Sequence, residues 1–115
     1  MSYTKTNDQV ITFTKGMLEV RIFSGREEMG REAAANVSAT IQKLLENKKE
    51  INMIFAAAPS QSDFMQELIA DERIQWDRIN AFHMDEYIGL EKEAPQGFGN
   101  FLRDRIFGKV PFKSV

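Results

Sequence analysis

The sequence predicts an α/β fold with a parallel sheet. Three short runs of apolar, β-branched and aromatic residues have the length of strands, at 17–23, 51–57 and 78–84. Helical patterns follow each of them, at 26–48, 60–69 and 98–108. Strands that alternate with helices form right-handed βαβ units, and the strands of such units run parallel. Three parallel strands make a narrow sheet with open edges, so we expect the first half of a larger doubly wound domain.

The composition indicates one soluble domain and excludes several classes of site. The chain has 115 residues, of which 43% are hydrophobic and 28% charged, as in ordinary globular proteins. A net charge of −2 gives no basis for binding nucleic acid or an anionic membrane. The absence of cysteine excludes disulfides and thiolate metal sites, and a single histidine argues against a His-rich metal centre. Without a membrane-length apolar run or the apolar core of a signal peptide, we expect a cytoplasmic protein.

Residues 1–16 are polar, with one alternating patch at Val10, Ile11 and Phe13, and we expect an N-terminal arm or edge strand. Residues 17–115 then form the partial α/β domain. In the run 17–23, Glu19 and Arg21 alternate with apolar residues, which predicts a strand with one face more exposed to solvent than the other.

The first predicted helix is the clearest element of the chain. Ser24 and Glu27 have the spacing of a capping box at its start. Apolar residues then recur at helical spacing up to about Lys48: Met29, Ala33, Val37, Ile41, Leu44 and Leu45. The alanines at 33–35 would allow this helix to approach a sheet closely.

The second strand leads into a turn at 57–62 that could bind an anion. A helix is predicted to begin there, and free N–H groups and the dipole make a helix N-terminus favourable for anions. The hydroxyl groups of Ser60 and Ser62 could add donors. Ser60 could equally serve only as the helix cap, because Asp63 stands at the capping distance. No glycine-rich fingerprint supports nucleotide binding.

The third predicted strand ends abruptly at two adjacent carboxylates, Asp85 and Glu86. Ligands bind at the carboxyl ends of strands in open α/β sheets, so Asp85 is the candidate catalytic residue. Neighbouring side chains diverge at a strand end, so one carboxylate can face a ligand while the other binds backbone. Partial burial would raise the pKa of such a carboxyl and suit it to proton transfer. Alternatively, both carboxylates cap the next segment or pair with Arg103 or Arg105.

The only histidine, His83, lies inside the apolar run just before these carboxylates. A single histidine within a strand is more often a packed, hydrogen-bonded residue than a catalyst, because its catalytic roles depend on a partner. The sequence does not identify that partner, and we expect a structural role.

The segment at 81–90, AFHMDEYIGL, resembles the signature of the glucosamine-6-phosphate deaminase/isomerase family. That family has a nearly identical F-x-M-D-E-Y-x-G-L run at the end of a sheet strand. Pro95 and the aromatic helix pattern at 98–107 also agree with the order of the family's elements. The resemblance extends from about Val20 to the end of the chain.

This resemblance implies a Rossmann-like, three-layer α/β/α fold and an open-chain amino-sugar phosphate as the substrate. The implied reaction is aldose–ketose isomerisation with deamination, which yields fructose 6-phosphate and ammonia without a metal or organic cofactor. By the same resemblance, Asp85 corresponds to the base that moves the proton between C2 and C1. Glu86 is the implied supporting carboxylate of the catalytic pair.

The chain departs from the family pattern in two respects. The family's phosphate loop is a Gly-Gly-Thr-Pro type of turn, whereas the matching segment 58–62 contains no glycine, and its Pro59 has no N–H. Ser60, Gln61 and Ser62 are the remaining candidates to hold phosphate. The family's ring-opening histidine, its carboxylate partners and a phosphate-binding lysine lie in a C-terminal half without a counterpart here. We therefore expect an N-terminal half that turns over poorly alone.

Two other functions stay open at this point. A 6-phosphogluconolactonase-like hydrolase would share the fold and a phosphate loop, but would need a different acid–base set. A non-catalytic sugar-phosphate-binding module would be compatible with the altered loop. Open sheet edges also suggest that the chain could associate with a second copy of itself or with another chain.

Overall fold

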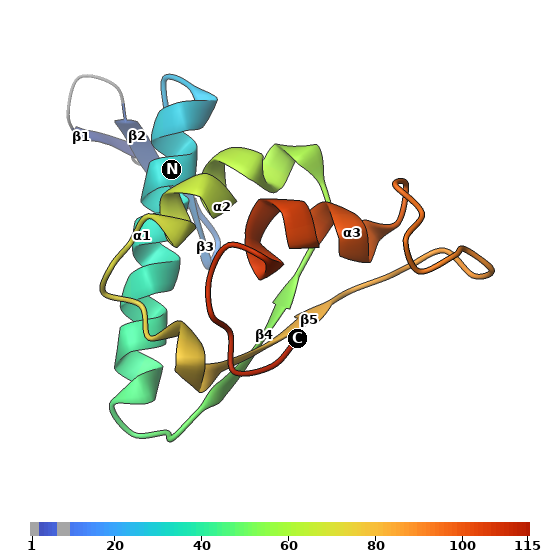
Figure 1. Ribbon diagram of the computed structural model, residues 1–115. Coiled ribbons are helices and arrows are strands. Elements are labelled where there is room, and N and C mark those ends of the chain that lie inside the picture. Colours follow the sequence, from blue (N-terminus) through green and yellow to red (C-terminus); the bar gives the residue numbers. More distant parts are fainter. Residues whose placement is uncertain (1–2, 7–9) are drawn as a thin grey trace.

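The computed structural model describes residues 3–6 and 10–115, and its fold is mixed α/β (Figure 1). The first sheet is antiparallel and contains β1 (Tyr3–Thr6), β2 (Val10–Lys15) and β3 (Leu18–Ile22). The second sheet pairs β4 (Ile51–Phe55) and β5 (Ile79–His83) in parallel. The helices are α1 (Arg26–Leu45), α2 (Ser62–Ile69) and α3 (Phe98–Leu102). Short 3-10 segments occupy Pro59–Gln61 and Trp76–Arg78, and a π-helical turn at Arg103–Phe107 extends α3. The predicted α/β class with a parallel sheet is confirmed.

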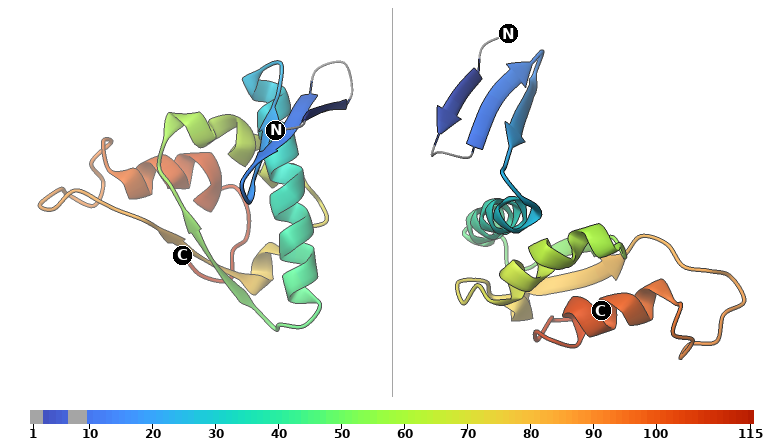
Figure 2. Two further views of the ribbon diagram at one scale, coloured as in Figure 1. Left: turned by 180° about the vertical axis from the view of Figure 1, so that it is seen from behind. Right: turned by 90° about the horizontal axis from the view of Figure 1, so that it is seen from above.

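The predicted strand at 17–23 forms as β3, but it does not join the parallel sheet. It pairs antiparallel with β2, so that Lys15 lies opposite Leu18. Gly16 takes a positive φ of 62° in the tight turn between them, a conformation that glycine adopts without strain. This hairpin needs only neighbours in sequence, whereas pairing with β4 would need contact across α1. The predicted pairing is therefore wrong, and Figure 2 shows the antiparallel sheet set apart beyond α1.

The N-terminal segment 1–16, expected to be an arm or an edge strand, contributes β1 and β2 to this sheet. Residues 1–2 and 7–9 lie outside the described residues. An ion pair between Arg21 on β3 and Glu32 on α1, at 2.7 Å, links the antiparallel sheet to the first helix.

Helix α1 packs against α2 through small residues. Its buried positions are Gly30, Ala34, Ser38, Ile41 and Leu45. The sequence predicted that Met29, Ala33 and Val37 would be covered, each one position before a residue that is buried in the structure. Met29 is instead 51% exposed. Small side chains allow the two helices to approach closely. The size of the side chains, as well as their polarity, therefore determines which face of α1 is covered.

Both ends of α1 differ from the prediction. The N-cap residue is Gly25, in an extended conformation, and not Ser24. The helix ends at Leu45, before the predicted Lys48. The guanidinium of Arg78 donates hydrogen bonds to the carbonyl oxygen of Leu45, at 2.9 Å, and to that of Lys48. Arg78 directly precedes β5, so it satisfies carbonyl groups at the helix end and ties that end to the parallel sheet.

One face of the parallel sheet forms the core. Ile51 and Phe55 of β4 and Ile79 and Ala81 of β5 are buried on it. The helices contribute large side chains that are almost fully buried: Met65, Leu68, Leu102 and Ile106. The rings of Phe55, Trp76, Phe107 and Phe112 meet edge-on, with centroids 5.1 to 5.8 Å apart.

The opposite face of the same sheet is open to solvent. Ile54 is 63% exposed and Phe82 is 53% exposed. Figure 2, seen from behind, shows no helix drawn over β4 and β5 on this side. The apolar runs predicted strands that are buried on both faces, but this structure covers only one face.

The C-terminal tail begins a further parallel strand beside β5. The N–H of Lys113 donates to the carbonyl oxygen of Ile79 at 2.9 Å, and the N–H of Ala81 donates to that of Ser114 at 2.8 Å. Asn80 and Ser114 form a parallel bridge. This pairing lies after the last helix, where the alternation of elements predicts another strand.

We expect Gly30→Ala to lower the free energy of unfolding by about 1 to 3 kcal/mol, because overpacking forces the backbones apart. The added Cβ would lie 2.9 Å from the Cβ of Asp63 and 3.1 Å from the backbone nitrogen of Phe64. Denaturant unfolding measures the difference. The control, Ala39→Gly at an exposed position of α1, reports the intrinsic helix preference for alanine, about 1 kcal/mol. A stabilisation by Gly30→Ala of that size would refute the close helix contact.

We expect Arg78→Ala to destabilise the fold by about 1 to 3 kcal/mol, because it leaves carbonyl groups at the end of α1 without their donor. Arg78→Lys should recover little of this loss, since one ammonium group cannot replace the guanidinium fork that reaches Leu45 and Lys48. Thermal unfolding, with exposed Lys109→Ala as a control for loss of charge, tests this. Equal stability of the wild type and Arg78→Ala would show that the hydrogen bonds from Arg78 to the end of α1 do not stabilise the fold.

Candidate functional site

The carboxyl ends of β4 and β5 lie side by side. Phe55 is paired with His83, and the N–H of Met84 donates to the carbonyl oxygen of Phe55 at 3.2 Å. Beyond β4 the chain turns through 56–61 into α2, and beyond β5 it continues into the acidic run. The structure therefore brings the two regions predicted from the sequence to the same edge of the sheet, where α/β folds bind ligands.

Asp85 is the first residue beyond the last hydrogen bond of the sheet. Its side chain is exposed and makes no hydrogen bond or ion pair with the described part of the chain. The partial burial expected from the sequence is absent, because the loop at 87–97 extends away from the sheet (Figure 1). Both carboxylate oxygens of Asp85 are therefore accessible to a ligand.

Glu86, in contrast, binds the backbone. Its carboxylate accepts hydrogen bonds from the N–H groups of Phe98, at 2.8 Å, Gly99, at 2.9 Å, and Tyr87, at 3.1 Å. The N–H groups of Gly99 and Phe98, followed by that of Tyr87 and by the nearby His83, lower the pKa of this carboxyl. The predicted divergence of the two carboxylates is confirmed. Glu86 stabilises the N-terminus of α3.

His83 has a partner that the sequence did not identify. Its Nε2 lies 3.8 Å from an Oε2 of Glu86, and its ring centroid lies 6.5 Å from that of Phe107. The side chain is 31% exposed and makes no side-chain hydrogen bond within the described chain, so the packed, hydrogen-bonded core residue expected from the sequence is only partly realised. His83 therefore lies behind the Glu86 carboxylate, between the sheet and α3.

Asn100 is a residue of this region that the sequence reasoning missed. Its Nδ2 donates to the carbonyl oxygens of Lys92, at 2.8 Å, and Ala94, at 2.7 Å. Its Oδ1 accepts a hydrogen bond from Arg103 at 2.8 Å. The available signal was weak: an amide side chain in the first turn of a helix that follows a loop with proline and glycine. The expected alternative partner Arg105 instead stacks its guanidinium on Phe101, 5.1 Å from the ring centroid.

The predicted phosphate turn offers few backbone donors. Pro59 has no N–H, while the N–H of Gln61 donates to Ala58 at 2.9 Å and that of Ser62 to Pro59. The N-cap of α2 is Gln61, without a side-chain cap, so helix capping by Ser60, the alternative to an anion site, does not occur. An anion at this turn would depend mainly on the side chains of Ser60, Gln61 and Ser62.

Arg26 brings a positive charge to the same turn. It forms an ion pair with Asp63 and donates to the carbonyl oxygen of Pro59 at 3.3 Å. A pocket of about 340 Å³ lies here between the first turns of α1 and α2, lined in part by Arg26, Ser60 and Gln61. The guanidinium is already paired with Asp63, so its charge is partly compensated.

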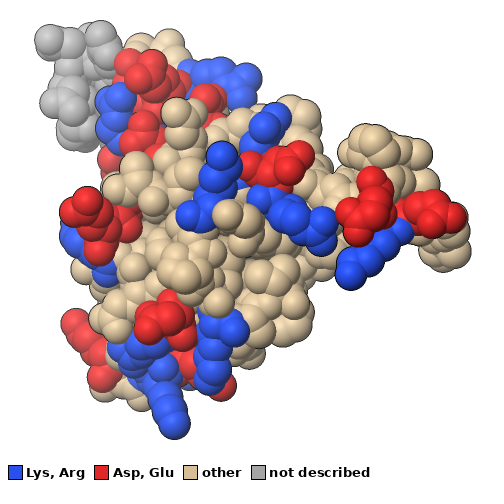
Figure 3. Space-filling model, in the orientation of Figure 1, with Lys and Arg blue, Asp and Glu red and all other residues tan. Residues whose placement is uncertain are grey.

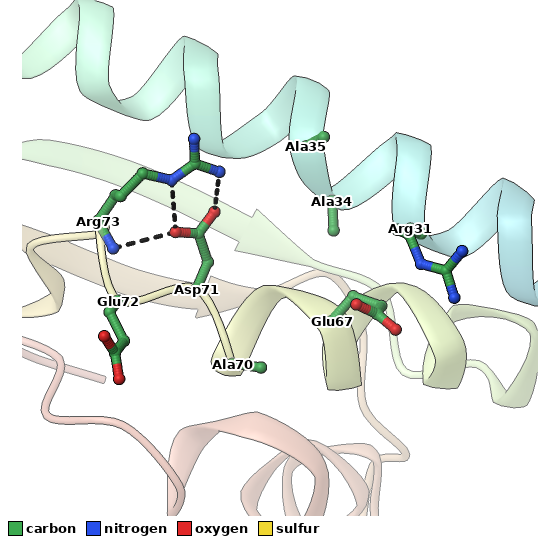
Figure 4. A pocket seen from close by; sticks show the side chains of 8 residues that line it. All are labelled: Arg31, Ala34, Ala35, Glu67, Ala70, Asp71, Glu72 and Arg73. Carbon is green, nitrogen blue, oxygen red and sulfur yellow. Dashed lines mark hydrogen bonds and ion pairs between the residues drawn. The ribbon is translucent and has the colours of Figure 1, made fainter.

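A pocket of about 400 Å³ lies between α1 and the C-terminal end of α2 (Figure 4). Arg73 and Asp71 line it and bind each other through two side-chain hydrogen bonds, at 2.8 and 2.9 Å. The guanidinium of Arg73 keeps the pKa of Asp71 well below its usual range. None of the predicted site residues lines this pocket, and its charged pair is internally satisfied.

Basic and acidic side chains are interspersed over the face in Figure 3, without a broad basic field. Within residues 3–6 and 10–115, no helix is long and apolar enough to cross a membrane. The same residues contain no cluster of three or more His, Asp or Glu side chains placed to hold a metal ion.

Sequence comparisons relate the chain to glucosamine-6-phosphate deaminases, although no family model matches it. The enzyme of an Exiguobacterium species is 37% identical over 49 residues, which are 43% of this chain and 19% of the relative. That of Streptococcus sanguinis is 25% identical over 73 residues, or 64% and 30% of the two chains. That of Lactobacillus delbrueckii is 23% identical over 96 residues, or 84% and 38%.

Solved structures confirm the fold. A monomeric glucosamine-6-phosphate deaminase of the NagB superfamily superposes with a TM-score of 0.66 at 23% identity, over 79% of this chain and 36% of that one. A 6-phosphogluconolactonase-like protein from Neisseria gonorrhoeae gives a TM-score of 0.66 at 16% identity, over 76% and 37%. The chain matches less than two fifths of the length of each of these relatives.

We expect the stability supplied by Glu86 to depend on pH. Its pKa is lowered in the folded state, so the contribution is present above the unfolded-state pKa and is lost as the pH falls through the folded value. The gap in unfolding free energy between the wild type and Glu86→Gln should therefore narrow as the solution is acidified. Carbon NMR of the Glu86 carboxyl should show a midpoint below that of ordinary glutamate. A midpoint above it, or a gap independent of pH, would contradict this.

Proposed function

Because this chain is a homologue of the glucosamine-6-phosphate deaminases, we propose that the protein carrying it isomerises and deaminates an amino-sugar phosphate. Asp85 is the base in this proposal. It removes the proton from C2 of the open-chain sugar and delivers it to C1, while a second proton passes from the amine to the C1 oxygen, which leaves an alcohol at C1 and an imine at C2. Water then hydrolyses the imine, which gives the carbonyl at C2 and releases ammonia. A cytoplasmic location and a small-molecule partner are parts of the same proposal.

The position of Asp85 carries this proposal. The residue stands immediately beyond β5, at the edge of the sheet where the turn after β4 begins, and its carboxylate has no partner among the described residues. A general base must reach a carbon-bound proton directly, so a carboxylate engaged elsewhere could not serve. Glu86 is already bound to three N–H groups, which leaves Asp85 as the carboxylate available for proton transfer.

The turn after β4 supplies the proposed phosphate site. Ser60, Gln61 and Ser62 would donate from two hydroxyl groups and one amide, since the N–H groups of Gln61 and Ser62 are engaged. The N-terminal dipole of α2 favours a negative charge at this position. Arg26 lies beside the turn and could add its charge if a phosphate displaced Asp63.

The test is release of ammonia from glucosamine 6-phosphate, with Asp85→Asn as the decisive variant. We expect the substitution to reduce turnover by about 10² to 10⁴-fold, the usual contribution of a general base, while substrate binding persists. Asp77→Asn is the matched control, because Asp77 precedes β5 and lies at the opposite end of the strand. A coupled ammonia assay gives the rate, and calorimetry gives the affinity.

Turnover at the wild-type rate in Asp85→Asn would refute the assignment of the base. Hydrolysis of a sugar lactone without ammonia release would favour the lactonase function, whose fold this chain shares. Tight binding of a sugar phosphate with neither activity would favour a non-catalytic binding module. Association of the chain with a second copy, suggested by its open sheet edges, is tested separately by sedimentation.

A further inference from the structure

Asp85 lies between two fixed points of the backbone. On one side, the N–H of Met84 is bonded to the carbonyl oxygen of Phe55 in the parallel sheet. On the other side, the side chain of Glu86 is bonded to the N–H groups of Phe98 and Gly99 at the start of α3. One residue therefore separates the end of the sheet from an anchor on a helix, and that residue is the proposed base.

A second side chain holds the loop that follows. Asn100 donates to the carbonyl oxygens of Lys92 and Ala94, and so closes the distal part of the 87–97 loop onto α3. Arg103 fixes the orientation of this amide by donating to its oxygen at 2.8 Å. The ring of Tyr87 also packs on that of Phe98, with centroids 4.8 Å apart. Both ends of the loop are therefore attached to the same short helix.

We propose that Glu86 and Asn100 form a two-point latch that orients Asp85 for proton transfer. Both are positioning residues in this view, and neither contacts the reacting atoms. The inference rests on the proposed function of Asp85 and adds how its direction is set. Direction matters because a displacement of about 1 Å in a reacting group can cost on the order of 10²-fold in rate.

The chemistry of Glu86 supports this role over direct acid–base catalysis. A carboxylate that accepts three N–H bonds is stabilised as the anion and has no proton to donate. Glutamine at this position would offer only one acceptor oxygen, and its NH₂ group would face a backbone N–H. Glu86→Gln therefore breaks the latch with little change in volume.

Asn100→Asp is the corresponding change at the second point. It keeps the oxygen that accepts from Arg103, but removes the amide that donates to Lys92 and Ala94. Glu91→Gln is the control, because Glu91 is an exposed carboxylate in the same loop without a side-chain partner in the described chain. The three variants thus separate loss of the latch from loss of a charge.

The first measurement is NMR relaxation of the 115-residue chain, which reports backbone order residue by residue. In Glu86→Gln and Asn100→Asp we expect lower order parameters at Asp85 and through 87–97, with β4 and α1 unchanged. Glu91→Gln should match the wild type. In the active protein carrying this sequence, both latch variants should lower kcat about 10-fold or more while KM stays within about 2-fold, as expected for a misoriented base.

Unchanged order at Asp85, or unchanged kcat, in both latch variants would overturn the proposal. Loss of order spread over β4 and α1 would also overturn it, since Glu86 and Asn100 would then support the whole fold. The failure of the proposed function looks different: Asp85→Asn would keep full turnover, or no ammonia would form, while the relaxation data still reported the latch.

Discussion

The register of β4 against β5 is the constraint on which the candidate site depends. Phe55 lies opposite His83, which places Asp85 just beyond the end of the sheet. Side chains alternate between the two faces of a strand, so a shift of one residue would move Ile79 and Ala81 out of the core. The same apolar contacts that hold the sheet in place therefore determine where the chain leaves it, and hence where the proposed base stands.

The core also fixes the position of α3, which lies across the candidate site from the sheet. This helix has only five residues before the π-helical turn, too few to be stable alone. Leu102 and Ile106 hold it in the core, and the Glu86 carboxylate satisfies its first N–H groups. The loop between Glu86 and α3 is consequently fixed at its ends by packing and capping, while its middle remains exposed.

The sequence predicted the elements better than their partners. Periodicity located the strands and helices, because it depends on residues close in the chain. It did not predict that β3 would pair with β2, since an alternating strand has the same pattern with any partner. Arg78 and Asn100 were missed for a related reason. Each binds backbone carbonyl groups, and since every residue has one, the residue types do not indicate which carbonyl group is bound. The divergence of Asp85 and Glu86 was predictable because the alternation of side chains is a local property.

In the proposed reaction, the direction of the Asp85 carboxylate and its strength as a base have separate origins. Direction comes from the sheet bond at Met84 and the anchor at Glu86, both present in this chain. Strength requires that water be excluded, because burial disfavours the charged form and raises the pKa of a carboxyl. Asp85 is exposed and the nearby sheet face is open, so no described residue supplies this burial. Orientation is therefore the contribution to the proposed catalysis that the described residues supply.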